Sequence, residues 1–163
     1  MGRTTTLSLR IFQGLLAAAN LALSAYVVNW YLTVTRRGAP ASLSFLVFAS
    51  SFSLLSLLWL ELAPRLLPAA AAHACGTLSV EATNAVFYFA AFIAHAVFLG
   101  GLSMCHGTVC TAGRVDSVVA AAAFCAWIAS TIFTAKAMFI NGDARRRPAD
   151  SNKSTQMGEA AIA

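Results

Sequence analysis

The stretch TLSVEATNAVFYFAAFIAHAVFLGGLS, residues 77–103, is long and apolar enough to cross a bilayer as a helix. It nevertheless carries Glu81, Asn84, Tyr88 and His95, whose side chains can all form hydrogen bonds. On a helix that advances about 100° per residue, these four residues fall within one arc of about 60°. Because polar groups are costly in hydrocarbon, this arc is expected to face other protein. The stretch therefore predicts a membrane-spanning helix that belongs to a bundle.

The composition supports a membrane domain. The chain has 163 residues, of which 59% are hydrophobic and 10% are charged. A soluble domain carries about 25% charged residues, so this chain has too little charge to cover a water-soluble globule. Its net charge of +5 comes from basic residues that flank apolar stretches and form no basic face, so nucleic-acid binding is not expected.

Three further apolar stretches are long enough to span a membrane, and short polar segments separate them. Short connections favour antiparallel neighbours, so the fold class is predicted as all-α, an antiparallel four-helix transmembrane bundle within residues 7–140. Residues 141–163 are polar, lack apolar periodicity and are predicted to form a disordered cytosolic tail. The predicted spans are about 11–34, 43–63, 77–103 and 117–140.

The first span repeats the pattern of the third, since its polar residues also share one helical face. We refer to the aligned polar residues of these two spans as the interior polar stripe, which consists of Gln13, Asn20, Asn84, Tyr88 and His95.

The distribution of basic residues predicts the topology. Four spans place both termini on one side, and the cytosolic side is expected to hold more Arg and Lys. The two predicted external loops hold three such residues, Arg36, Arg37 and Arg114. The termini and the second loop hold seven: Arg3, Arg10, Arg65, Arg145, Arg146, Arg147 and Lys153. Both termini are therefore predicted to be cytosolic.

Two intramembrane charges, Glu81 and Lys136, are predicted at similar depth on consecutive antiparallel helices, so we expect an ion pair between them. In the alternative, Lys136 extends to the inner headgroups while Glu81 is protonated or bonds Asn84. His95 is interpreted as a hydrogen-bonded interior histidine. The alternative is a proton-binding site shared with Glu81 in a transporter.

Cys105 and Cys110 lie in the predicted external loop with four residues between them. In an oxidising compartment this spacing allows a disulfide, with free thiols as the alternative. A metal site is not expected, because a fourth ligand is missing. A redox role is disfavoured because the spacing is not that of a C-x-x-C motif.

The basic cluster of the tail, Arg145, Arg146 and Arg147, is expected beside the inner leaflet. There it would attract anionic lipid by about 1 kcal/mol per residue. The alternative is ordinary anchoring of the last span by flanking positive charge.

The chain resembles a fungal-type MARVEL-domain protein. The resemblance rests on LRIFQGLLAAANLALSAYVV, on FLVFASSFSLLSLLWLELAPRL, and on a third span in which the early acid Glu81 precedes NAVFYFAAFIAHAVFLGGLS. The loop CHGTVC before an alanine-rich fourth span adds to it. The resemblance implies a four-span protein with cytosolic termini, in the plasma membrane or in endomembrane vesicles.

Such a protein is expected to organise membrane domains or vesicle trafficking through helix packing and lipid contacts. Expected partners are membrane lipids, including sterol-rich domains and anionic inner-leaflet lipids, and other membrane proteins or further copies of the chain. No catalytic residue, cofactor or metal is expected, so the chain is interpreted as a non-enzyme. The alternative function is a small-solute or proton-coupled carrier that uses Glu81 and His95.

Overall fold

A computed structural model describes residues 3–35, 38–66, 74–101 and 107–160 of the chain. Side chains are described over 6–34, 38–62, 75–101 and 107–140. The described chain is helical apart from a short connection and a bend, and it contains no strand. Its elements are α1 (Arg3–Trp30), η1 (Tyr31–Thr35), α2 (Ala41–Leu66), α4 (Ala74–Gly101) and α5 (Thr108–Ala160).

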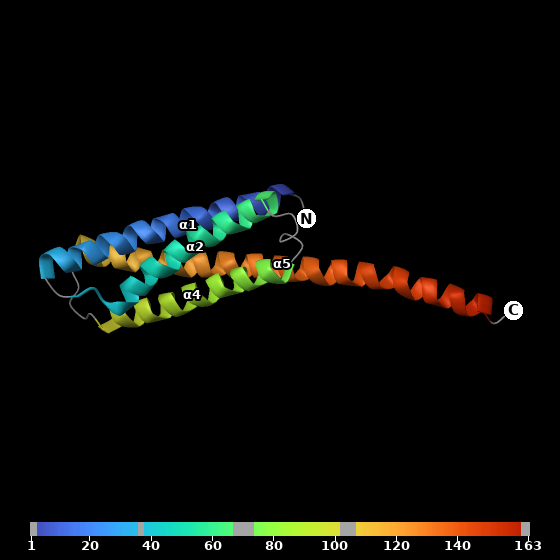
Figure 1. Ribbon diagram of the computed structural model, residues 1–163. Helices are drawn as coiled ribbons and strands as arrows, with labels where there is room; N and C mark the ends of the chain where they lie inside the picture. The colour runs from blue at the N-terminus through green and yellow to red at the C-terminus, as the bar shows by residue number, and fades with distance from the viewer. Residues whose placement is uncertain (1–2, 36–37, 67–73, 102–106, 161–163) are drawn as a thin grey trace.

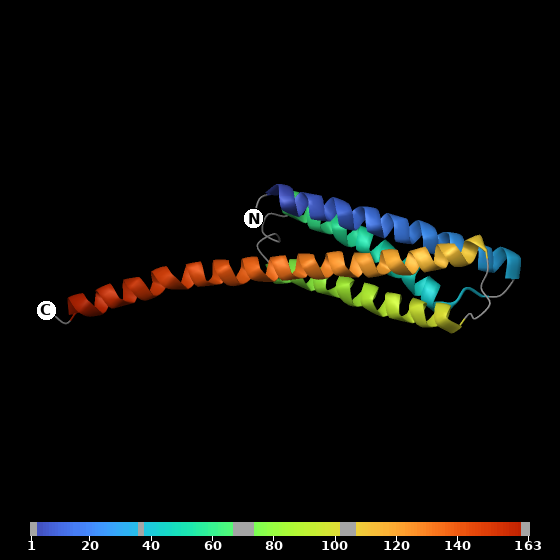
Figure 2. The same cartoon turned by 180° about the vertical axis from the view of Figure 1, so that it is seen from behind.

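The four long helices form an antiparallel bundle, which confirms the predicted fold class (Figure 1). Each contains a segment that is long and apolar enough to cross a membrane. Neighbours around the bundle are α1 with α2, α2 with α4, α4 with α5 and α5 with α1. Helices α1 and α4 therefore face each other across one diagonal, and α2 and α5 face each other across the other. Both chain ends lie at the same end of the bundle, seen in both views (Figures 1 and 2).

Two helix boundaries differ from the predicted spans. Helix α1 begins at Arg3, so Arg10 lies inside the helix and not in a polar lead before it. Helix α5 begins at Thr108, so much of the predicted third loop is helical. Gly107 starts this helix with a φ of 114°, a left-handed conformation that glycine adopts without steric cost. Its carbonyl oxygen accepts a hydrogen bond from the Thr111 amide at 3.2 Å.

Local sequence also explains the other helix ends. The carbonyl of Pro40 accepts hydrogen bonds from the amides of Leu43 and Ser44, at 3.0 and 3.2 Å, and so caps the start of α2. Helix α1 ends in the π-helical turn η1, where Trp30 and Tyr31 pack edge to face and Tyr31 contacts the ring of Phe98 on α4.

The bundle interior is built from small residues and a few large ones. Alanines from several helices are almost fully buried, which lets the helix backbones approach closely. Trp127 and Tyr88 are the largest fully buried side chains. Together with Leu46 and Leu57 they fill the space that the alanines leave.

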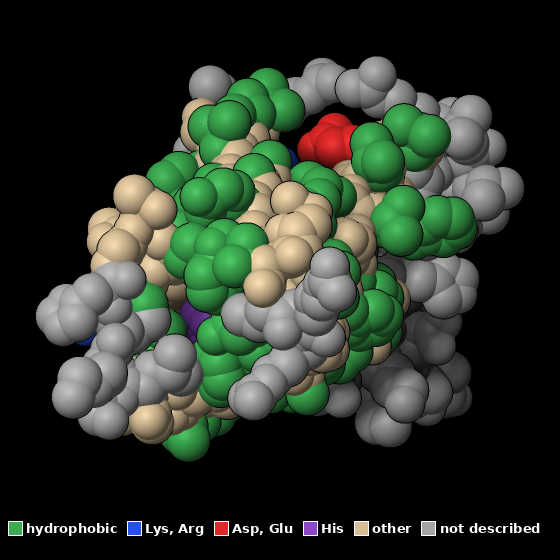
Figure 3. Space-filling model, turned by 90° about the vertical axis from the view of Figure 1, so that its left-hand side faces the viewer, with side chains coloured by type: hydrophobic (Ala, Val, Ile, Leu, Met, Phe, Trp, Pro, Cys, Tyr) green, Lys and Arg blue, Asp and Glu red, His purple; other side chains and the backbone are tan. Residues whose placement is uncertain are grey.

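The outer surface is apolar. Large hydrophobic side chains are exposed along all four helices, as expected for surfaces that meet lipid. Seen from the end opposite the termini, hydrophobic side chains cover most of the described surface (Figure 3). Helix α5 extends past the other three helices beyond Ile140 (Figures 1 and 2). The backbone of residues 141–160 thus continues α5, where the sequence predicts a disordered tail.

Candidate functional site

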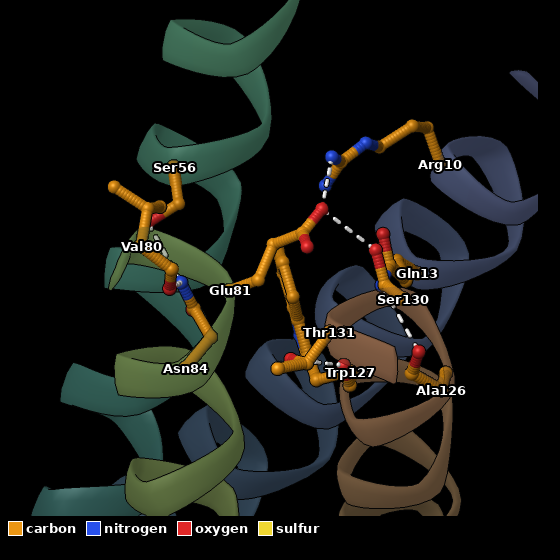
Figure 4. A network of polar contacts seen from close by, with 10 residues as sticks. All are labelled: Arg10, Gln13, Ser56, Val80, Glu81, Asn84, Ala126, Trp127, Ser130 and Thr131. Carbon is orange, nitrogen blue, oxygen red and sulfur yellow. Dashed lines mark hydrogen bonds and ion pairs between the residues drawn. The ribbon is translucent and has the colours of Figure 1, made fainter. Parts of the chain in front are cut away.

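A polar network near the end of the bundle where both chain ends lie is centred on Glu81 of α4, whose side chain is fully buried. Its Oε1 accepts a charge-assisted hydrogen bond from Nη2 of Arg10 on α1, and the two side chains form an ion pair. The same oxygen accepts a hydrogen bond at 2.7 Å from Oγ of Ser130 on α5. Figure 4 shows these side chains converging from three helices. The network therefore ties α1, α4 and α5 together.

Arg10 and its neighbour Gln13 make further contacts with α5. The guanidinium carbon of Arg10 lies 5.9 Å from the centre of the Trp127 ring, within the range of a cation–π interaction. One turn deeper, Gln13 Nε2 donates to the main-chain oxygen of Ala126 at 3.2 Å (Figure 4). A cavity of about 150 Å3 adjoins Arg10, Glu81 and Ser130, with room and polar partners for water.

Lys136 is not the partner of Glu81, so the predicted Glu81–Lys136 ion pair is replaced by Glu81–Arg10. The Lys136 side chain is exposed and forms no ion pair within the described part of the chain. A carboxylate in the bundle interior needs a partner that also points inward. Arg10 lies on the inward side of α1, whereas Lys136 lies on the outer side of α5.

Asn84 connects α4 to α2. Its Nδ2 donates to Oγ of Ser56 at 3.0 Å and to the main-chain oxygen of Val80 at 2.9 Å, as Figure 4 shows. Asn84 is fully buried, and Ser56 is nearly so. Thus all four helices are joined by side-chain hydrogen bonds near one end of the bundle.

A second polar group lies deeper, around Asp116 on α5, which is fully buried. With its amide nitrogen facing α5, Asn20 on α1 donates to Oδ1 of Asp116 and, at 3.1 Å, to its main-chain oxygen. The Tyr88 hydroxyl on α4 lies among Asn20, Ser50 and Ser53. This group, like the first, draws on helices from every side of the bundle.

His95 lies nearest the opposite end of the bundle and is also buried. Its Nε2 donates to the main-chain oxygen of Gly113 on α5 at 3.1 Å, and its ring stacks on Phe98. Gly113 allows this close approach, since a Cβ there would lie 3.3 Å from Leu99 Cδ2 and 3.8 Å from His95 Nε2. This arrangement is that of a hydrogen-bonded interior histidine.

The polar residues of the stripe therefore lie along the bundle axis in a defined order. Gln13, Asn20, Asn84, Tyr88 and His95 are all buried. Along the bundle axis, Tyr88 and Asp116 lie between Glu81 and His95. Two further titratable side chains therefore separate Glu81 from His95. Within the described residues, no cluster of three or more His, Cys, Asp or Glu is placed to hold a metal ion.

The cysteines and the basic tail are described only in part. Cys110 lies in the first turn of α5 and is disulfide-bonded, whereas Cys75 and Cys125 are free. The predicted partner, Cys105, lies outside the described residues, so the pairing stays a prediction. The side chains of the basic cluster, Arg145, Arg146 and Arg147, also lie outside the described set.

Arg10 and Asp116 are the two charged residues of these networks that sequence reasoning missed. Arg10 precedes the predicted first span and Asp116 precedes the predicted fourth span, and charges beside apolar runs usually mark the ends of spans. One signal was available for Arg10. It lies three residues before Gln13, which places it about 60° from the centre of the polar face of its helix.

A bundle of four apolar helices, each long enough to cross a membrane, with Glu81, His95 and Asp116 buried in its interior, is a multi-pass membrane protein. A family model described as MARVEL, a membrane-associating domain, matches residues 2–133 of the chain. Because this match covers most of the 163 residues, the chain belongs to the MARVEL family. Neither the comparison with curated proteins nor that with solved structures gives a match.

Proposed function

We propose that this protein organises membrane domains or vesicle trafficking through helix packing and lipid contacts, and that it has no catalytic role. One observation carries the proposal: Glu81, Asn84 and His95 are hydrogen-bonded inside the bundle, while large apolar side chains cover its outside. The Arg10–Glu81–Ser130 network joins three helices and so favours a fixed bundle. The surface offered to other molecules is then the lipid-facing one.

The proposal includes location and partners. We place the protein in the plasma membrane or in endomembrane vesicles, with both termini cytosolic. The basic residues Arg145, Arg146 and Arg147 would then contact anionic lipids of the inner leaflet. Sterol-rich domains, other membrane proteins and further copies of the chain are the proposed lateral partners.

Lateral distribution in cells tests the proposal. A fluorescently tagged full-length chain is imaged before and after sterol depletion, with an unrelated four-span protein as the control. We expect patches that disperse when sterol is removed. A uniform distribution that does not change would contradict a role in organising sterol-rich domains. Crosslinking in native membranes then identifies the neighbours.

A second candidate function is a small-solute or proton-coupled carrier that uses Glu81 and His95. The observation that favours it is the presence of Tyr88 and Asp116 between these two groups. Against it, Glu81 is already bonded to Arg10 and Ser130, and the described part of the chain shows no broken helix of the kind that carriers use at their binding sites. Proteoliposomes decide between the two functions: proton or solute flux that Glu81→Gln abolishes would favour the carrier.

A further inference from the structure

The outer side of α5 carries a cation, Lys136. Its side chain is exposed and forms no ion pair within the described part of the chain. Trp127, which is fully buried, lies nine residues earlier and therefore about 180° away around the helix. Four apolar residues, 137–140, follow Lys136 before the polar Asn141, so the lysine lies inside an apolar segment. A lysine in this position is costly unless it extends to the headgroups or meets an anion.

An anion lies on a different surface, in a groove of about 600 Å3 between α1 and α2. The groove is mainly apolar, and leucines of α2 form much of its lining. Glu61 also lines it, is partly exposed and forms no ion pair with another described residue. Arg10 and Glu81 pair inside the bundle. Among the described side chains, Glu61 and Lys136 are therefore the accessible charges at this end of the bundle.

These two charges lie at similar levels along the bundle axis. Contacts between neighbouring helices relate the level of α2 to that of α5. They are Asn84–Ser56 and Glu81–Ser130 through α4 (Figure 4), and Gly14–Leu57 and Gln13–Ala126 through α1. Counted from these contacts at 1.5 Å per residue, Lys136 lies about 6 to 10 Å nearer the chain ends than Glu61. The long flexible stem of lysine, together with the glutamate side chain, can bridge this offset.

We infer that α5 of one copy of this chain docks in the α1–α2 groove of a second copy, where the Lys136 ammonium donates to the Glu61 carboxylate. Ile132 and Phe139 are exposed on the same side of α5 as Lys136, so they would face the leucines of the groove. The contact gives each of the two accessible charges a partner of opposite sign. This inference rests on the proposed function and assigns the surfaces through which copies of the chain meet.

The topology of a membrane protein makes this contact repeat. All copies in one membrane have the same orientation, so a given residue lies at the same level in every copy. The groove and the outer side of α5 are different surfaces, so the contact is head-to-tail and not self-complementary. When two copies have met, one groove and one α5 surface remain free. Further copies can then add to form a ring or a row, which is a direct way to organise a membrane domain.

Disulfide crosslinking of the full-length chain in lipid vesicles tests the contact. Cys75→Ser and Cys125→Ser first remove the free thiols. Leu62→Cys then places a thiol in the groove, and Ile132→Cys places one on α5. We expect a mixture of these two variants, with different tags, to form crosslinked dimers and nothing larger. A chain that carries both changes should form a ladder of larger products.

The control pairs Ile132→Cys with Ser79→Cys, an exposed position at a similar level on α4, and should give no crosslink. Two results would overturn the inference. One is a mixture of Leu62→Cys and Ile132→Cys that gives no dimer. The other is a single-cysteine variant that crosslinks to itself as readily as to its partner variant, because the contact would then be self-complementary.

Charge reversal tests the ion pair. Energy transfer between labelled copies in vesicles measures association, and Glu61→Lys or Lys136→Glu alone should weaken it about tenfold, because like charges then meet. The double variant restores opposite charges and should restore association. Arg114→Glu, which reverses an exposed charge near the other end of the bundle, should have no effect. Association that is unchanged by both single reversals, or not restored in the double variant, would overturn the pair. Thermal unfolding shows that each variant is folded.

The lateral-distribution experiment separates this inference from the proposed function. If the wild-type protein forms sterol-dependent patches but its copies give no crosslink between groove and α5, only the docking assignment fails. If the copies crosslink as expected but the protein is uniformly distributed in cells, the contact stands and the organising role fails.

Discussion

The guanidinium of Arg10 on α1 pairs with the carboxylate of Glu81 on α4 across a diagonal of the bundle. These helices are not neighbours: among the described residues, α1 packs mainly on α2 and α5. The pair therefore lies in the bundle interior, where Ser130 and the Trp127 ring also reach it. Such a contact fixes the rotation of two opposite helices at once.

Loss of either partner should destabilise the bundle strongly. Arg10→Met leaves the Glu81 carboxylate buried without its cation, and Glu81→Leu leaves the guanidinium without its anion. We expect each change to cost about 3–5 kcal/mol, and the double variant to cost clearly less than the sum, because no buried charge is left unpaired. Reversible unfolding in mixed detergent micelles measures the three values.

Lys136→Met is the matched control for this cycle. Because Lys136 is exposed, its removal should change the free energy of unfolding by less than about 0.5 kcal/mol, and its effect should add to that of Glu81→Leu. Additive effects of Arg10→Met and Glu81→Leu, together with coupling between Lys136 and Glu81, would instead support the pair expected from the sequence.

These residues show how far the sequence determines the site. The polar face of one helix follows from that helix alone, so the stripe of Glu81, Asn84, Tyr88 and His95 was predictable. The partner of Glu81 depends on how the four helices cross and rotate relative to one another. The periodicity of a single helix does not predict this arrangement. Arg10 next to an apolar run looks like a flanking charge until Glu81 is placed opposite it.

Asp116 was missed for a different reason. A charged residue after several glycines and polar residues looks like part of a loop, because single-helix reasoning does not allow an acid in an apolar span. Asn20 and the serines of α2 make its burial tolerable, and these residues are distant in the sequence. The number and order of the spans, by contrast, depend only on local hydropathy and were predictable.

The contact between Asn20 and Asp116 should contribute measurably to stability. Asn20→Leu removes the donor and leaves the oxygens of Asp116 in an apolar interior, so we expect a loss of about 1–3 kcal/mol. Asn20→Asp should lower the stability at least as much, because it places a second carboxylate against that of Asp116. Unfolding in micelles checks both, with Ala19→Leu as the control at an exposed position of the same helix. Wild-type stability in Asn20→Leu would show that the contact is not formed.

The hydrogen bond between Asn84 and Ser56 should contribute less. In membrane bundles such bonds average about 0.6 kcal/mol and reach about 1.7 kcal/mol, because polar groups find other partners when helices separate. We therefore expect Ser56→Ala to cost about 1 kcal/mol or less, and Asn84→Leu to cost more, since Asn84 also bonds Val80. A double-variant cycle isolates the pair, and Ser51→Ala is the control because Ser51 bonds only within its own helix.

Chemical labelling should show how Cys110 is bonded. We expect a maleimide to modify Cys110 only after reduction, because Cys110 is disulfide-bonded, while Cys75 and Cys125 are free thiols. If Cys105 is its partner, Cys105→Ser should make Cys110 reactive without reduction. Labelling of unreduced wild-type protein at Cys110, shown by mass spectrometry of its peptides, would contradict the disulfide.

The approach of His95 to Gly113 should make position 113 intolerant of large side chains. A Cβ there lies 3.3 Å from Leu99 Cδ2, so alanine requires a small shift, whereas leucine must displace both Leu99 and the His95 ring. We expect Gly113→Leu to cost about 1–3 kcal/mol, as overpacking usually does, and Gly113→Ala to cost less. Gly101→Leu is the control, since a Cβ there meets no atom within 4 Å. If Gly113→Leu unfolded like Gly101→Leu, α4 and α5 would have to lie farther apart at this end than the His95–Gly113 hydrogen bond requires.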